Sequence, residues 1–190
     1  EVRKTMVEAN LLTGVGALHG TGLTGDGQVV AIIDTGVDSN AGVVHPGLAD
    51  DLVGQACFRT ENDCIGGATS AEDQDGHGTH VAGIITGPNG VAPDAQFHAL
   101  KVFTTGSTSD TNILNALNHV IGLNTATPGA VDLVNMSLGG GNYATSAACD
   151  ADGAAYLSAF ATLNSQGTSV FVATGNDAQT GQVSSPGCIT

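Results

Sequence analysis

The sequence predicts an α/β fold in which helices flank a doubly wound, mostly parallel sheet. Short apolar segments alternate along the chain with helical patterns, as they do in βαβ units. No internal repeat or low-complexity linker interrupts this alternation. The segments that would follow the strands are small, polar or glycine-rich, which is typical of loops that line a ligand cleft at the carboxyl edge of such a sheet.

Four segments predict strands. Residues 28–33 are apolar and rich in β-branched side chains, and glycine-containing turns bound them on both sides, so we expect a buried strand. The other predicted strands are residues 96–103, 131–136 and 170–174. The last fifteen residues predict a loop.

Three segments predict helices, at residues 78–86, 110–123 and 152–163. The second is amphipathic, with Asp110 as its expected N-cap. Its apolar face comprises Ile113, Leu114, Leu117, Val120 and Ile121. The third helix would align Tyr156, Phe160 and Leu163.

Composition limits the partners. The 190 residues allow one domain or most of a larger one, and 41% hydrophobic residues exclude a disordered chain. Acidic residues outnumber basic ones by 18 to 4, giving a net charge of −14. Such a surface repels nucleic acid and anionic lipid, so we expect neither as a partner. The charge favours solubility at high salt, with calcium binding as a second interpretation. No apolar run approaches the ~18 residues of a membrane span.

Four cysteines, Cys57, Cys64, Cys149 and Cys188, can pair in three ways. We favour a Cys57–Cys64 bridge that closes a short loop and a Cys149–Cys188 bridge that ties two loops together. This pairing implies an oxidising compartment. Four reduced thiols in a cytosolic protein are the alternative. The chain begins with Glu1 rather than Met, which we interpret as a removed leader or a piece of a longer sequence.

An acid and a histidine are the first candidates for chemistry. Asp34 follows the buried strand directly, where a carboxylate could orient a histidine or simply cap a turn. Glycines flank His77 at a predicted helix start and leave its imidazole unhindered for proton transfer. His80 lies three residues further on, so a zinc pair or a structural role are alternatives, although the sequence contains no HExxH pattern.

Two loop segments add polar groups. Asn176 follows the last predicted strand, where its amide could donate to a developing oxyanion or serve an ordinary turn. Residues 137–140 could form an edge that pairs with an extended peptide, or a glycine-rich turn. Residues 20–25 match GxGxxG but precede a strand instead of following one, which argues against nucleotide binding.

Taken together, four segments resemble the subtilisin-like serine peptidases, the subtilases. They are VVAIIDTGVD (29–38), DGHGTHVAGII (75–85), VDLVNMSLGGG (131–141) and VFVATGND (170–177), in that family's order. The resemblance implies an incomplete, three-layer α/β/α, subtilisin-like fold. Residues 1–16 would be an N-terminal extension, and residues 17–190 a catalytic core that lacks its C-terminal segment.

The resemblance also implies a serine endopeptidase that hydrolyses peptide bonds by acyl transfer with an Asp-His-Ser triad. Asp34 would orient the imidazole, His77 would be the general base, Asn176 would donate to the oxyanion, and His80 would pack behind the site. Two facing edges would bind the substrate backbone, formed by Gly106, Ser107 and Thr108 and by Ser137, Leu138 and Gly139. Three small residues would help to line an apolar S1 pocket: Ala173, Thr174 and Gly175.

The family's nucleophile is missing from this chain. The serine of subtilases follows the oxyanion Asn in a Gly-Thr-Ser-Met-Ala block, and the chain stops soon after Asn176. Ser169 follows Gly-Thr but leads into a strand, so we reject it. We therefore expect the N-terminal part of a catalytic domain that is inactive alone. A metallohydrolase built on Asp75, His77 and His80, and a non-catalytic peptide-binding pseudo-peptidase, are the rival functions.

No cofactor is expected for catalysis, and we assign no metal ligand. The insertion that forms a calcium site after the His helix in many relatives is absent, so any structural calcium is left unassigned. The expected partners are a protein or peptide substrate and, in the precursor, a prodomain. The loops 56–64 and 184–188 resemble those of secreted bacterial members, which supports the favoured disulfides and an extracellular location.

Overall fold

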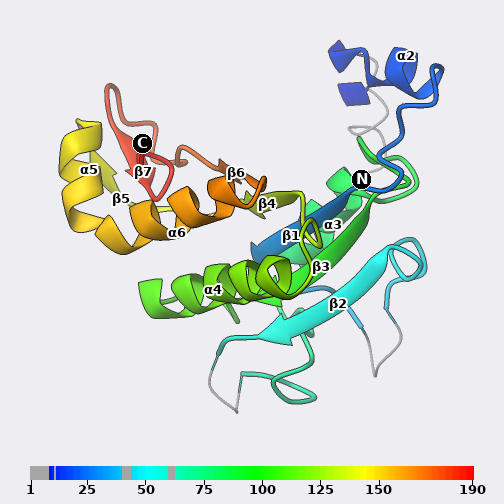
Figure 1. Ribbon diagram of the computed structural model, residues 1–190, viewed down its shortest axis with the longest axis horizontal. Helices are drawn as coiled ribbons and strands as arrows, with labels where there is room; N and C mark the ends of the chain where they lie inside the picture. Colours follow the sequence, from blue (N-terminus) through cyan, green and yellow to red (C-terminus); the bar gives the residue numbers. More distant parts are fainter. Residues whose placement is uncertain (1–8, 11, 40–43, 60–62) are drawn as a thin grey trace.

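A five-stranded sheet forms the centre of the computed structural model, which describes residues 9–10, 12–39, 44–59 and 63–190. The strand order is β2-β3-β1-β4-β6, and every pairing in it is parallel. The strands are β1 (Val29–Asp34), β2 (Leu52–Cys57), β3 (Gln96–Lys101), β4 (Leu133–Met136) and β6 (Ser169–Val172). Figure 1 shows this sheet between its helices, so the predicted α/β class is confirmed.

β1 lies in the middle of the sheet because it is apolar from Val29 to Ile33. It pairs with β3 from Val29 to Asp34 and with β4 from Val30 to Ile32. Both faces of β1 are covered: Ala31 and Ile33 belong to one apolar cluster and Val30 and Ile32 to the other. A strand buried on both faces reads as a continuous apolar run, which is why residues 28–33 are recognisable in the sequence.

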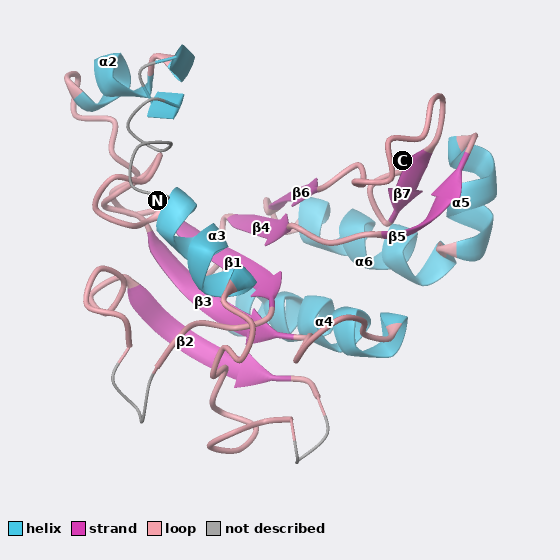
Figure 2. Ribbon diagram, turned by 180° about the vertical axis from the view of Figure 1, so that it is seen from behind, coloured by secondary structure: helices cyan, strands magenta, loops and turns pink. Residues whose placement is uncertain are grey.

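Helices cover the sheet on both faces. The helix α3 (His77–Ile85) packs on the face of Val30 and Ile32, and α4 (Asp110–Ala126) and α6 (Ala154–Ser165) pack on the other. Figure 2 shows α3 in front of the sheet, with α4 and α6 behind it. The predicted faces of α4 and α6 are the ones that meet the core.

A smaller unit stands beside the main sheet. It contains the antiparallel strands β5 (Gly140–Tyr143) and β7 (Val183–Ser185) and the helix α5 (Ser146–Asp152). A Cys149–Cys188 disulfide ties α5 to the end of the chain, and a Cys57–Cys64 disulfide closes the loop after β2. The favoured pairing is thereby confirmed. The short helix α2 (Val15–His19) precedes the sheet.

Several expectations need correction. Ser109 caps α4, because its hydroxyl accepts a hydrogen bond from the amide of Asn112, whereas Asp110 is the first helical residue. The predicted helix 152–163 corresponds to α6, which begins two residues later at Ala154, and α5 is an additional helix that ends at Asp152. The last fifteen residues contain β7 as well as loop. Of the expected N-terminal extension, residues 1–8 and 11 lie outside the described part.

Within the described ranges, no helix combines the length and the apolarity that crossing a bilayer would require.

Candidate active site

The site begins at the carboxyl end of β1. Asp34 is the last residue of that strand and is 2% exposed. The turn that follows needs glycine at position 36, because Gly36 has a φ of +112° and a Cβ there would lie 2.0 Å from the carbonyl oxygen of Ala71. The Asp-Thr-Gly sequence therefore turns the chain sharply just where the carboxylate leaves the sheet.

A second close approach places the helix α3 over this turn. The amide of Gly78 donates to Thr35 Oγ1 at 2.7 Å. A Cβ at Gly78 would lie 2.3 Å from the carbonyl oxygen of Gly36, so only glycine allows the first turn of the helix to come so near. His77, the first residue of α3, is carried against the tip of β1 as a result.

Asp34 and His77 are in direct contact, as their predicted roles require. His77 Nδ1 lies 2.7 Å from Asp34 Oδ1. Since an ionised carboxylate only accepts, Nδ1 is the protonated nitrogen and Nε2 is left with a free lone pair. The His77 side chain is 50% exposed although its partner is buried. An imidazole fixed on one side and open on the other can take a proton from an incoming group.

The contact shifts the pKa of both groups. The hydrogen bond to Asp34 raises the pKa of His77, and attraction by the carboxylates of Asp34, Asp75 and Asp73 adds to the rise. Burial raises the pKa of Asp34, while the hydrogen bonds from His77 and from the Thr35 amide act in the opposite direction. Asp34 Oδ2 is buried with no hydrogen-bond partner among the described residues. The raised pKa of His77 means that the imidazolium keeps its proton to a higher pH.

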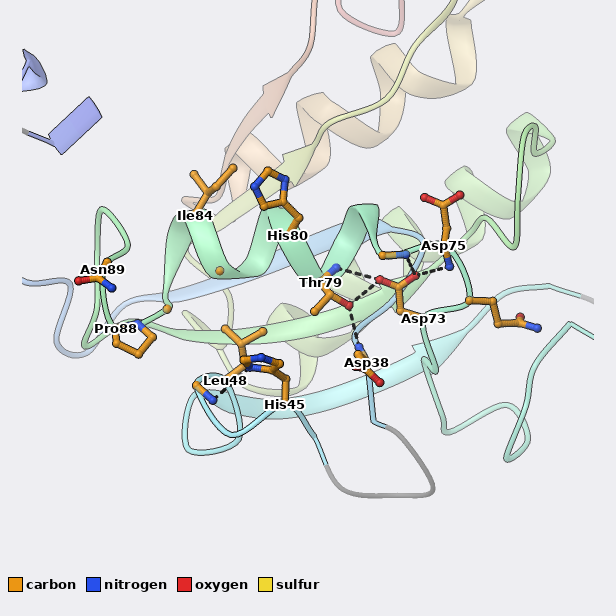
Figure 3. Close-up of a pocket in the computed structure, with 15 residues that line it drawn as sticks. Asp38, His45, Leu48, Asp73, Asp75, Thr79, His80, Ile84, Pro88 and Asn89 are labelled. Atoms are coloured by element: carbon orange, nitrogen blue, oxygen red, sulfur yellow. Dashed lines mark hydrogen bonds between the residues drawn. The ribbon is translucent and has the colours of Figure 1, made fainter. Parts of the chain in front are cut away.

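A carboxylate next to the helix holds its first turn. Asp73 accepts hydrogen bonds from the amides of Asp75, Gly76 and Thr79 and from the Thr79 hydroxyl. Thr79 Oγ1 in turn accepts from the amide of Asp38, as Figure 3 shows. Burial acts to raise the pKa of Asp73, but these hydrogen bonds outweigh it and the pKa is lowered. No sequence motif marks Asp73 as the carboxylate that holds the first turn of the helix that carries His77.

A cavity of about 770 Å³ lies beside α3, away from the Asp34 contact. Figure 3 shows His80 and Ile84 on the helix and His45 and Leu48 on the segment before β2. His80 is exposed there, so its expected packing behind the site is wrong for the part of the chain that the structure describes. Within the same part, no group of three or more His, Cys, Asp and Glu side chains is arranged to hold a metal ion, and we assign none.

The two expected substrate edges line a common cavity. Gly106, Ser107 and Thr108 precede α4, and Leu138 and Gly139 follow β4. All five line a space of about 410 Å³. Ser137, the remaining residue of the second edge, accepts a hydrogen bond from Asn135 Nδ2 at 3.0 Å.

The third expected segment follows β6. Gly175 has a φ of +110°, and the carbonyl of Thr174 accepts a hydrogen bond from the amide of Ser184 at 2.9 Å. Asn176 is exposed at the same carboxyl edge of the sheet as Asp34, with β4 between their strands. The roles of Ala173, Thr174, Gly175 and Asn176 stay predictions.

A buried lysine contacts the turn that follows Asp34. Lys101 ends β3 opposite Asp34 and is 0% exposed. Its Nζ donates to the carbonyl of Thr35 at 2.8 Å. Burial lowers the pKa of Lys101, partly offset by attraction to surrounding carboxylates. The β3 sequence Gln-Phe-His-Ala-Leu-Lys contains no motif that marks the lysine, so the sequence offers no signal for this contact.

Comparison with known proteins supports the same identification. Residues 25–190 match the family model described as the subtilase family. Subtilisin E of Bacillus subtilis is 35% identical over 178 residues, covering 90% of this chain and 40% of that protein. Subtilisin Savinase of Lederbergia lenta is 38% identical over 130 residues, covering 65% and 41%. The chain thus spans about two fifths of these curated relatives.

Solved structures agree with the fold. The S41 psychrophilic protease superposes with a TM-score of 0.68 at 28% identity, covering 92% of this chain and 56% of that one. Sphericase gives 0.65 at 30% identity, covering 86% and 51%. Three findings agree: the strand order of the sheet, the contact between an aspartate and a histidine where the motifs predict it, and a family model that matches most of the residues. The chain therefore belongs to the subtilase family.

Proposed function

We propose that the full-length protein is a serine endopeptidase in which Asp34 orients His77 and His77 is the general base. The observation that carries this proposal is the 2.7 Å contact between His77 Nδ1 and the buried carboxylate of Asp34, with the imidazole half exposed. A histidine that is held in one tautomer and reaches solvent has the geometry of the acid–base member of such a triad.

The chemistry divides between this chain and a serine outside it. His77 Nε2 takes the proton of the serine hydroxyl as its oxygen attacks the substrate carbonyl carbon. The same proton passes to the leaving amine when the C–N bond breaks, and water then repeats the sequence to release the acid. Asp34 stays ionised throughout and stabilises the imidazolium.

Asn176 completes the proposed machinery as the oxyanion donor. Its exposed position at the carboxyl edge supports this role, because a donor must face the cleft where the carbonyl oxygen becomes charged. The substrate backbone would lie between residues 106–108 and 137–139, which is supported by the cavity that they share. The small residues 173–175 would leave room for an apolar P1 side chain.

The test uses a fluorophosphonate probe and a set of chromogenic peptides on the full-length protein. We expect covalent labelling, peptide hydrolysis and loss of both in His77→Ala, whereas the 190-residue chain alone should show neither. Activity that is lost to a chelator but survives the fluorophosphonate would overturn the proposal in favour of a metallohydrolase.

A non-catalytic peptide-binding pseudo-peptidase is the alternative. Retained peptide binding by the full-length protein, without labelling or hydrolysis, would favour it. Secretion and processing of a prodomain are further parts of the proposal, since the resemblance to secreted bacterial subtilases implies both and the two disulfides fit an oxidising compartment. Mass spectrometry of the mature protein from the culture medium would test both.

A further inference from the structure

We propose that Lys101 is a positioning residue for the Asp34–His77 pair and acts through the carbonyl oxygen of Thr35. This inference rests on the proposed function and assigns a role to a buried side chain that the peptidase mechanism does not use.

The first step is the place of Lys101 in the fold. It ends β3, pairs in register with Asp34 on β1, and is 0% exposed. Its Nζ reaches over the end of the neighbouring strand to the Thr35 carbonyl, 2.8 Å away. The lysine thus extends from one strand to the turn that follows the other.

The second step is that Thr35 contacts Asp34 directly and His77 indirectly, through the residue that follows the histidine. Its amide donates to Asp34 Oδ1 at 2.7 Å, the same oxygen that His77 Nδ1 contacts. Its hydroxyl oxygen accepts from the amide of Gly78, the residue next to His77, at 2.7 Å. The Thr35 carbonyl accepts from Lys101, so the amide, hydroxyl and carbonyl of Thr35 all take part in hydrogen bonds. Movement of this one residue would therefore displace the carboxylate and the imidazole together.

The third step is that burying this ammonium group is energetically unfavourable. Of the residues that the structure describes, no carboxylate lies within ion-pair distance of Nζ, so the ammonium is buried on a carbonyl contact with only longer-range attraction from Asp73, Glu72 and Asp63. Arg59 opposes this attraction. Buried charges are commonly replaceable by apolar side chains without loss of stability. A role in holding the turn explains a lysine here better than a contribution to stability does.

The variant that tests the proposal is Lys101→Met in the full-length protein, because methionine matches most of the lysine stem and lacks the ammonium. Leu100→Met is the matched control: Leu100 is the preceding residue of β3, is also 0% exposed, and belongs to the apolar cluster on the face of the sheet that α4 and α6 cover. Two readouts are compared, the kcat and KM of peptide hydrolysis and the exchange with water of the His77 Nδ1 proton followed by NMR. The second readout requires no peptidase activity.

We expect Lys101→Met to lower kcat by about 10- to 100-fold, since small misplacements of catalytic groups have effects of that size. KM should change by less than about two-fold, and exchange of the His77 Nδ1 proton should accelerate by about tenfold or more. Leu100→Met should leave all three near the parent values. If Lys101→Met does not fold, Lys101→Gln is measured in the same way, because its amide is one bond too short to keep the contact and the same losses are expected.

A folded Lys101 variant with unchanged kcat and unchanged proton exchange, even with a lower melting temperature, would overturn the proposal and make the lysine merely structural. The proposed function fails separately: if the parent protein hydrolyses no peptide, the exchange of the His77 proton still shows whether Lys101 holds the pair.

Discussion

The residues of the site differ in how far their roles could be predicted. Asp34 and His77 could be assigned because each lies in a short motif and has a side chain that matches a known chemistry. The roles of Lys101, Thr35 and Asp73 could not, because they depend on which atoms meet after folding. Nothing in the linear order indicates that a lysine 66 residues away from Thr35 donates to its carbonyl.

Activity should depend on pH through His77. The general base must be neutral, and contact with Asp34 raises the pKa of His77 above its usual 6.5. We expect kcat/KM of the full-length protein to rise with pH and to level off only above that raised pKa. In Asp34→Asn the residual activity should have its inflection closer to 6.5. An inflection at or below 6.5 in the parent would contradict the assignment.

Removing the Asn176 amide should affect turnover rather than binding. Loss of one oxyanion donor costs about 10²–10³ in kcat, a magnitude that itself comes from a subtilisin. We expect Asn176→Ala to show this loss with KM changed little, measured in steady-state hydrolysis of a chromogenic peptide. A rise in KM at constant kcat would instead make Asn176 an ordinary substrate-binding residue.

At the scale of elements, predictability follows pattern strength. β1 and α4 were visible because burial imposes a continuous apolar run on one and an apolar stripe on the other. β2 was not, since it is an edge strand with mixed exposure and a register shift near Gly54. β5 and β7 are three to four residues long and owe their structure to each other, a pairing that no local pattern shows.

The close approach of α3 to the turn that follows β1 can be tested by substituting two glycines of that helix. In Gly78→Ala the new methyl would meet the Gly36 carbonyl oxygen at 2.3 Å, so we expect a loss of about 1–3 kcal/mol in unfolding free energy. Gly83→Ala is the control: nothing lies within 4 Å, and it should gain roughly 0.5–1 kcal/mol. Urea denaturation measures both, and equal stabilities would argue against the close approach.

The packing of β3 against α4 should make stability sensitive to acid. Burial lowers the pKa of His98, with repulsion from His119 adding to it, and burial lowers the pKa of His119. As the pH falls, the unfolded chain therefore protonates these two histidines before the folded chain does. Their contribution to folding stability is complete above pH 6.5 and declines as the pH falls below that value. The raised pKa of His77 has the opposite effect on stability: its contribution is present below pH 6.5 and is lost as the pH rises above that value.

The measurement is therefore the difference between parent and variant. We expect the parent to lose more stability between pH 7.5 and pH 5 than a His98→Asn/His119→Gln double variant, followed by urea midpoints. Parallel pH dependences for the two proteins would exclude these histidines as the cause.

At the scale of the whole molecule, the two disulfides constrain different lengths of chain. The Cys57–Cys64 bridge spans 7 residues and the Cys149–Cys188 bridge spans 39. Loop-closure entropy then predicts about 2.5 kcal/mol for the first and about 4 kcal/mol for the second. Double serine variants of each pair, compared by urea denaturation, should lose stability in that order. The reverse order would show that local contacts outweigh chain entropy here.

The central claim is that Asp34 and His77 act as one catalytic unit, and kcat of Asp34→Asn in the full-length protein tests it most directly. The amide would leave the imidazole in place but favour the wrong tautomer, so we predict a fall in kcat of about 10⁴-fold at neutral pH. A variant that folds like the parent and keeps kcat within about tenfold would contradict the account.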